Sequence, residues 1–183
     1  MHTDDDTLTT SHPQPAASIE SSAARPVDDL LQGDHHIAMV MTMIGDTHSS
    51  RPVTCVAVYD HRLSFLVNRS VDWVQAIAEN RAVVHVTVAD VARNVYVSLS
   101  GTAIVVHDEA EIARLWSPAA RDFFDGPDDP QAAALHFDVT AGEYWEGPSG
   151  RLGRAVALLR AAMSGDEPDG GGQGAVLGTD TID

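Results

Sequence analysis

Lysine is absent from this 183-residue sequence, so its 11 basic residues are all arginine, and 27 acidic residues outnumber them. The formal net charge is −16 at pH 7. Nucleic acids and anionic membranes attract proteins through positive charge, because both present phosphate groups. The charge balance therefore predicts that neither is a partner of this chain.

Cysteine and long apolar runs are also scarce. The single cysteine, Cys55, excludes a disulfide within the chain. Its expected place in a buried strand, without a neighbouring cation, predicts an unreactive thiol. No apolar run approaches the ~20 residues that cross a bilayer, and the acidic start MHTDDDTL lacks an apolar signal segment. These absences favour a cytoplasmic protein with no membrane partner.

Hydrophobic periodicity is weak at both ends of the chain. Residues 1–31 are rich in Ser, Thr, Pro, Ala and Asp, and residues 165–183 are rich in Gly and Asp. Such composition is typical of disordered segments, although residues 28–31 have the pattern of a short helix. We expect two mostly disordered acidic tails around one domain at residues 32–164. Removal of 1–26 and 165–183 should then leave the melting temperature nearly unchanged.

The stretch between these tails has the pattern of short strands. Runs of Val, Ile, Leu, Phe and Met predict strands at 36–44, 53–59, 63–68, 82–89, 94–107, 132–139 and 143–146. Helical spacing and capping residues predict helices near 70–80, 108–117, 118–124 and 149–163. In the first strand, Met39, Met41 and Met43 share a face, which we expect to fill the core. Gly101, within a strand, indicates a bulge or a close backbone approach.

About six strands with short inserted helices favour a mainly β (α+β) small barrel over a doubly wound sheet. The Arg51-Pro52 opening, Asn68 at the end of the next strand, and the segments YVSLSG (96–101), LWSPAARDFFDGPDDP (115–130) and EYWEGP (143–148) carry a family likeness. Over about residues 34–163 the sequence resembles the FMN-binding split-barrel superfamily of pyridoxamine 5'-phosphate oxidase, in its general stress protein 26 branch. The resemblance implies a split β-barrel that forms a homodimer, with each flavin between subunits.

The resemblance also implies which residues contact FMN. Arg51 matches the phosphate clamp, and a guanidinium suits this role because it binds phosphate oxygens in a bidentate fork. After Pro52, Val53 and Thr54 match residues that present backbone groups to the flavin ring. Asn68 and Trp145 match family positions near the cofactor, and Arg69 and Trp73 are further candidate contacts beside the clamp.

The sequence departs from the family pattern at the phosphate clamp. Val71 stands where flavin binders place a serine, and Trp73 stands where they place a phosphate-binding lysine. Each charged hydrogen bond contributes roughly 1.5–3 kcal/mol, so the departures predict weaker binding unless Arg69 moves in or Trp73 stacks on a ring. The oxidase's RLH motif becomes Arg151-Leu152-Gly153 here. Vitamin B6 oxidase activity is therefore not expected.

Three functions of different classes remain open. The first is a flavin-dependent oxidoreductase of unknown substrate, the second a non-catalytic flavin-binding stress protein, and the third a cofactor-free scaffold. A haem variant would need an axial histidine, and nothing selects among His48, His61 and His85. A deazaflavin would need a cluster of Arg and Lys for its polyanionic tail. No metal site is expected, because the histidines form neither HxxxH nor HxH.

Overall fold

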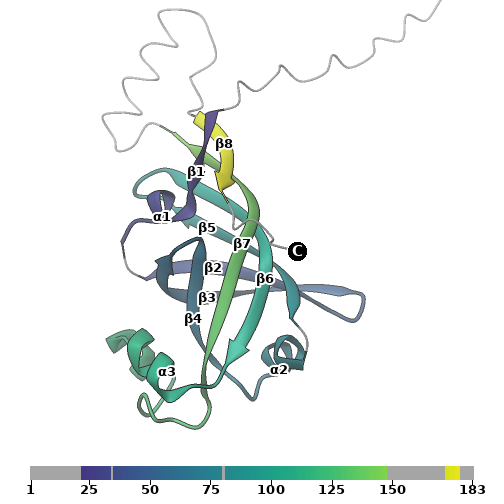
Figure 1. Cartoon of the computed structure of the whole chain (residues 1–183), viewed down its shortest axis with the longest axis vertical. Helices are drawn as coiled ribbons and strands as arrows, with labels where there is room; N and C mark the ends of the chain where they lie inside the picture. The colour runs from purple at the N-terminus through teal and green to yellow at the C-terminus, as the bar shows by residue number, and fades with distance from the viewer. Residues whose placement is uncertain (1–21, 34, 80, 148–171, 178–183) are drawn as a thin grey trace, which may run out of the picture.

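The structure is a computed structural model that describes residues 22–33, 35–79, 81–147 and 172–177. Six antiparallel strands form a closed barrel in the order β7-β4-β3-β2-β5-β6, and pairing of β6 with β7 closes it (Figure 1). These strands are β2 (His36–Ile44), β3 (Thr47–Tyr59), β4 (Arg62–Asn68), β5 (Ala82–Asp90), β6 (Val95–Val106) and β7 (Ala132–Glu146). The predicted split-barrel fold is confirmed.

Alternation along the strands produces the barrel interior. On β5, Val84, Val86 and Val88 are buried while the intervening residues lie on the outside. The same period places alternate apolar residues of β6 inside, as expected of β-branched residues on a pleated surface. Phe65 on β4 and Phe137 on β7 are the largest fully buried side chains. The core is thus the inside of the barrel.

The two faces of β2 are assigned opposite to the expectation. Ala38, Val40 and Thr42 point inward and are buried, whereas Met39 and Met43 are exposed. The prediction that the methionine face fills the core of this chain is therefore wrong. Both faces of β2 are apolar, so alternation alone could not show which face turns inward. An apolar stripe is left on the outside of the barrel.

Short helices are inserted at one end of the barrel. Helix α2 (Asp72–Glu79) joins β4 to β5, and α3 (Glu109–Leu115) with the 3-10 helix η1 (Pro118–Asp122) joins β6 to β7. As predicted, α3 begins at a cap in which the Asp108 carboxylate accepts a hydrogen bond from Glu111 N (2.8 Å). Figure 1 shows α2 and α3 at the same end of the barrel. No described helix is long and apolar enough to cross a membrane.

Segments from both predicted tails pack on the opposite end. Strand β1 (Ser22–Pro26) pairs in parallel with β8 (Gly172–Leu177), and β8 pairs with β7. Helix α1 (Val27–Leu30) follows β1 and buries Val27, Leu30 and Leu31. The expectation of disorder is therefore wrong at residues 22–27 and 172–177, whereas the short helix expected at 28–31 is present as α1. The strands SAARP and GQGAVL are short and contain few large apolar residues, so they show no hydrophobic period, and only long-range pairing gives them partners. Residues 1–21 and the helix expected at 149–163 lie outside the described residues.

Gly101 confirms its predicted role on β6. The β6–β7 register shifts between Ser100 and Gly101. A Cβ at this position would collide with the Asp138 carbonyl oxygen and would meet the Phe137 ring at 2.9 Å. Glycine is therefore required where β6 bends against β7.

Candidate functional site

The candidate site is a cavity of about 420 Å³ that opens where β3 and β4 diverge. Strand β3 pairs with β4 only from Cys55 to Tyr59, and beyond that point β4 continues along β7. Helices α2 and η1 cover the same end. The cavity is lined by Arg51, Pro52, Val53, Thr54, Val56, Leu66, Val67, Asn68, Val71, Trp73, Ser117, Ala119, Ala120, Phe123 and Phe124.

Most of the residues predicted to contact FMN meet in this cavity. Arg51, Pro52, Val53 and Thr54 line it from β3, and Asn68 and Trp73 line it from β4 and α2. Val71, which like Trp73 departs from the family pattern, is also in the wall. The remaining two predicted residues lie elsewhere. Arg69 borders a separate hollow beside α2, and Trp145 lies on the outer face of the barrel.

Arg51 is held in place by two contacts. Its guanidinium carbon lies 4.7 Å from the centroid of the Trp73 ring, and its Nη1 donates a hydrogen bond to Thr42 Oγ1 (2.8 Å). Burial lowers the pKa of Arg51 from its ordinary value, yet arginine remains charged in proteins. Trp73 is uncharged, so it does not replace the phosphate-binding lysine that the family pattern has at this position. It orients the arginine that is present through a cation–π contact.

Asn68 shapes the turn between β4 and α2. Its Oδ1 accepts hydrogen bonds from the backbone nitrogen of Ser70 (2.9 Å) and from Ser70 Oγ (2.6 Å). This Asx-type turn directs the chain from the barrel wall into α2. Asn68 thereby places Val71 and Trp73 at the cavity, in addition to lining it.

The backbone of β3 offers polar groups along the cavity. From Arg51 to Thr54 the strand pairs with β2 on one side, and the described pairing with β4 starts only at Cys55. Backbone groups on the side away from β2 can therefore hydrogen-bond a ligand, as at any sheet edge. Pro52, which has no N–H to offer, is compatible with this edge position.

The opposite wall was not identified from the sequence. Ser117, Ala119, Ala120, Phe123 and Phe124 line the cavity from the segment around η1. Ser117 is only 7% exposed, and its Oγ has no hydrogen-bond partner among the described residues. Phe123 is 75% exposed. Sequence spacing does not show which strands a loop faces, so the segment 115–130 carries a family likeness but no predicted contact with the cavity.

A second hollow, of about 510 Å³, lies on the outer face of the barrel. It is bordered by Ile37, Met39, Tyr96 and Trp145, all of which are exposed apolar side chains. Met39 pairs with Pro52 across β2 and β3, and directly opposed residues share a face of the sheet. The outer apolar face therefore runs up to the wall of the cavity.

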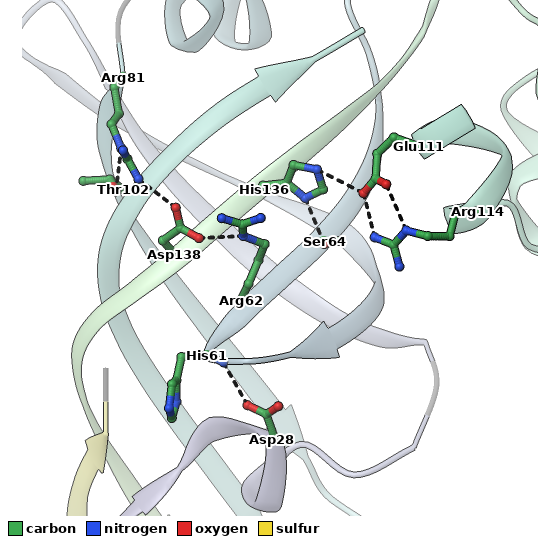
Figure 2. Close-up of polar contacts among 10 residues, drawn as sticks. All are labelled: Asp28, His61, Arg62, Ser64, Arg81, Thr102, Glu111, Arg114, His136 and Asp138. Atoms are coloured by element: carbon green, nitrogen blue, oxygen red, sulfur yellow. Dashed lines mark hydrogen bonds and ion pairs between the residues drawn. The ribbon is translucent and has the colours of Figure 1, made fainter. Parts of the chain in front are cut away.

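A polar cluster on β4, β7 and α3 resembles a catalytic triad in composition only. His136 Nδ1 lies 3.0 Å from Ser64 Oγ, and His136 Nε2 lies 3.2 Å from Glu111 Oε1, which also pairs with Arg114 (Figure 2). Ser64 and His136 are both buried, and neither borders the cavity. Beside them, Asp138 bridges Arg62 and Arg81 at 2.6 and 2.7 Å. The cluster thus fastens α3 and neighbouring strands together.

The other predicted candidates stay apart from the cavity. His48, His61 and His85 lie on β3, on the β3–β4 turn and on β5, and none of them borders it. Among the described residues, no three His, Cys, Asp or Glu side chains come together as a metal site would require. Cys55 is buried, and burial raises the pKa of its thiol to about 12, in agreement with an unreactive cysteine. Arg151–Gly153 lie outside the described residues.

The cavity residues fit the needs of FMN. The isoalloxazine ring requires apolar walls, which Val53, Val56 and Leu66 provide. The ring edge requires hydrogen-bonding groups, which the β3 backbone offers. The phosphate requires a cation. The Arg51 guanidinium, which lines this cavity, can provide it without a lysine. The volume lies within the roughly 300–1,000 Å³ typical of small-molecule sites.

Comparison with known proteins gives the same family. The family profile described as pyridoxamine 5'-phosphate oxidase like matches residues 23–169. A protein described as general stress protein 26 from Jannaschia sp. CCS1 is 23% identical, with a TM-score of 0.67, covering 76% of this chain and 89% of its own. General stress protein 26 from Bacillus anthracis str. Sterne is 19% identical, with a TM-score of 0.57, covering 64% and 89%.

A third structure similar to this chain is the general stress FMN/FAD binding protein from Xanthomonas citri. It is 22% identical, with a TM-score of 0.54, covering 63% of this chain and 82% of its own. At these identities the likeness concerns the fold. No curated protein sequence matches the chain. Because the family profile covers most of the sequence, the chain belongs to the pyridoxamine 5'-phosphate oxidase-like family.

Proposed function

We propose that this protein binds FMN in the cavity between β3, β4, α2 and η1, and that it is a flavin-dependent oxidoreductase. The observation that carries the proposal is the meeting of six sequence-predicted cofactor residues, Arg51, Pro52, Val53, Thr54, Asn68 and Trp73, in one cavity. The structural likeness to the Xanthomonas citri FMN/FAD binding protein supports it. The vitamin B6 oxidase reaction is not part of the proposal.

Each part of the cavity has its own role in the proposed complex. Arg51, oriented by Trp73 and Thr42, binds the phosphate through charge-assisted hydrogen bonds. The apolar side chains enclose the ring and exclude water, and the edge of β3 orients it. Bound FMN would supply the electron-transfer chemistry. The chain's contribution is binding, orientation and exclusion of solvent.

FMN and riboflavin together test the phosphate clamp, because they differ only in the phosphate. We expect Arg51→Gln to weaken FMN binding about ten- to a hundredfold and to leave riboflavin binding nearly unchanged. Arg69→Gln is the matched control, since it removes the same charge outside the cavity. Titration followed by flavin fluorescence gives all of these affinities. Equal losses in the two variants would contradict a phosphate clamp formed by Arg51 alone.

The two alternative functions predict different results. A cofactor-free scaffold would bind neither flavin in the wild-type protein, which would contradict the whole proposal. A non-catalytic flavin-binding protein would bind FMN but would not catalyse oxidation of a reduced nicotinamide. Steady-state oxidation of NADH or NADPH by the FMN-loaded protein, compared with free FMN at the same concentration, separates binding from catalysis.

We further propose that the protein is a homodimer whose interface is the outer apolar face. Ile37, Met39, Tyr96 and Trp145 are exposed together there, and monomeric proteins rarely expose large contiguous apolar patches. The face adjoins the cavity through the Met39–Pro52 pair. In this arrangement Trp145 would approach the flavin bound by the other copy, which accounts for its place outside the cavity of its own chain.

A single charge on this face should separate the two copies. We expect Met39→Glu to convert the protein to a monomer, because burying an unpaired carboxylate in an apolar interface is strongly unfavourable. Tyr59→Glu places the same charge on another exposed hydrophobic residue, at the end of β3, and should leave the dimer intact. Sedimentation velocity distinguishes the states. A monomeric wild-type protein at micromolar concentration would contradict this interface.

A further inference from the structure

The wall around η1 contains a polar group that the proposed flavin contacts do not use. Ser117 borders the cavity and is 7% exposed, and its Oγ has no hydrogen-bond partner among the described residues. Native structures contain few buried hydroxyls without a partner, because desolvation of such a group is unfavourable. A ligand that supplies the missing partner would remove this cost. The hydroxyl therefore indicates a binding contact on this wall.

The surroundings of Ser117 suit a flat apolar ligand. Ala119, Ala120 and Phe124 line the same wall, and Phe123 stands 75% exposed beside them. The face of an aromatic side chain stacks readily on a planar ring. A large aromatic residue left in solvent at the border of a cavity is thus typical of a surface that a ligand covers. Aromatic ligands gain most from this arrangement.

The side chains of the wall around η1 indicate which ligand charge this wall can accommodate. The residues of this segment that border the cavity are Ser117, Ala119, Ala120, Phe123 and Phe124, none of which carries a charge. A charged ligand placed against them would lose hydration without gaining a counter-ion, whereas a neutral one would not. Arg51 lines the cavity and is already paired with the flavin phosphate in the proposed complex. The wall around η1 therefore favours an uncharged occupant.

We propose that this wall is the substrate subsite, and that it takes a neutral, planar aromatic molecule whose carbonyl oxygen accepts a hydrogen bond from Ser117 Oγ. The aromatic ring of this molecule stacks on Phe123. The proposal rests on the proposed function, since the subsite adjoins the part of the cavity assigned to FMN. It adds a substrate class and two residues that determine it.

Three naphthalene probes test the class of ligand on the FMN-loaded protein. 2-Acetylnaphthalene carries the carbonyl, 2-ethylnaphthalene lacks it, and 2-naphthoate is an anion of similar shape. We expect 2-acetylnaphthalene to bind most tightly. Ser117→Ala should weaken its binding about five- to tenfold and leave the affinities for 2-ethylnaphthalene and FMN unchanged. Ser100→Ala, on the exposed side of β6, is the control and should change none of them.

Melting temperatures separate a binding role of Ser117 from a structural one. The ligand-free Ser117→Ala variant should melt at the same temperature as the wild-type protein or higher, because it loses an unpaired buried hydroxyl. A lower melting temperature would show that the hydroxyl stabilises the fold, and would overturn the proposal. Phe123→Ala provides a second variant, since its side chain is exposed. It should weaken both neutral probes equally without changing the melting temperature.

Other results would overturn the subsite in different ways. If Ser117→Ala weakens FMN instead of the ketone, Ser117 contacts the cofactor and the subsite is wrong. If the three probes bind equally, the proposed ligand class is wrong. If the wild-type protein fails to bind FMN, the proposed function fails. The same probe titration on the FMN-free protein then still decides whether Ser117 binds a neutral ketone.

Discussion

Polar side chains gather at two places on this barrel, around His136 and Asp138 on β7 and around Arg51 in the cavity. On β7, His136 has a partner at each ring nitrogen, and Asp138 binds an arginine with each carboxylate oxygen (Figure 2). In the cavity, Ser117 Oγ has no partner among the described residues. The Arg51 guanidinium is held by one hydroxyl and one aromatic face.

Whether a buried polar group has a partner within the chain distinguishes structural from ligand-binding residues better than residue type does. Ser64, His136 and Glu111 are the residue types of a hydrolase triad, yet their hydrogen-bonding groups are used within the chain. Ser117 belongs to no sequence motif of a catalytic site, but its hydroxyl has no partner among the described residues and is available to a ligand in the cavity. Buried polar groups are normally paired, so an unpaired group beside a cavity is the stronger indication of a ligand. Changes around β7 should therefore affect stability, and changes in the cavity should affect binding.

The largest expected loss of stability comes from the packing of α1 against the barrel, away from the cavity. Asp28 on α1 accepts backbone hydrogen bonds from Asp60 (2.7 Å) and His61 (3.1 Å), two turn residues with positive φ. Leu30 anchors α1 and is fully buried. We expect Leu30→Ala to lower the free energy of unfolding by about 2–5 kcal/mol. Urea denaturation measures it, with the exposed Gln32→Ala as control. An unchanged midpoint would show that α1 contributes little to the stability of the barrel.

A smaller loss is expected when the carboxylate between two arginines is removed. Asp138 lies 2.6 Å from Arg62 Nε and 2.7 Å from Arg81 Nη2. Asp138→Ala should destabilise the protein by about 1–2 kcal/mol, near the lower end for charged hydrogen bonds, because both arginines remain partly hydrated. Asp122→Ala, on the exposed surface of η1, should shift stability by less than about 0.5 kcal/mol. FMN affinity should be unchanged in both variants; a loss only in Asp138→Ala would break the division between the two regions.

Acid should weaken the β7 region through His136. Burial, followed by the charge of Arg62, lowers the pKa of His136 below its ordinary value. The unfolded chain then binds this proton more readily than the folded one, so stability is full above pH about 6.5 and falls as the pH drops below it. Glu111 acts in a separate, more acidic range, because its hydrogen bond with Arg114 lowers the pKa of its carboxyl.

His136→Gln isolates this contribution. The difference in melting temperature between pH 7 and pH 5 should be smaller in His136→Gln than in the wild-type protein. The exposed His48→Gln should behave like the wild-type protein. A pH dependence that is the same in all three proteins would show that His136 binds its proton equally in the folded and unfolded states.

The sequence allowed the barrel and one wall of the cavity to be predicted, for physical reasons. Strand alternation is local, so the bounds of β2 agree with the expectation residue for residue. The Arg51–Thr54 segment and Asn68 were found because they sit on strands whose ends a family likeness could align. What failed depended on contacts between distant segments. The pairing of β1 with β8 joins residues about 150 positions apart, beyond the reach of any sequence period.

Side-chain direction was the second feature that the sequence could not provide. Met39 faces outward because its neighbours Ala38 and Val40 fill the barrel interior, and two apolar faces look alike in one dimension. Trp73 was expected either to weaken the clamp or to stack on a ring. The structure places it under Arg51, a contact that joins α2 to β3 and that spacing along the chain does not predict.

The smallest expected effect comes from the hydroxyl that anchors Arg51. Thr42 is buried and its Oγ1 accepts the Arg51 hydrogen bond. Thr42→Val keeps the shape of the side chain but removes the acceptor, so Arg51 must be ordered by the ligand instead of beforehand. We expect FMN to bind about two- to fivefold more weakly, corresponding to roughly 0.5–1 kcal/mol. Riboflavin, which has no phosphate, should bind with unchanged affinity.

The stability of Thr42→Val decides how this result is interpreted. A valine buries no polar group, so the melting temperature should stay within a few degrees of the wild-type value. Weaker FMN binding at unchanged stability would show that Thr42 acts by positioning Arg51. This is the result expected if cavity residues affect binding and not stability. If riboflavin binding falls to the same extent, the substitution has altered the cavity wall instead. If FMN binding is unchanged, Trp73 alone is sufficient to hold the guanidinium where the phosphate binds.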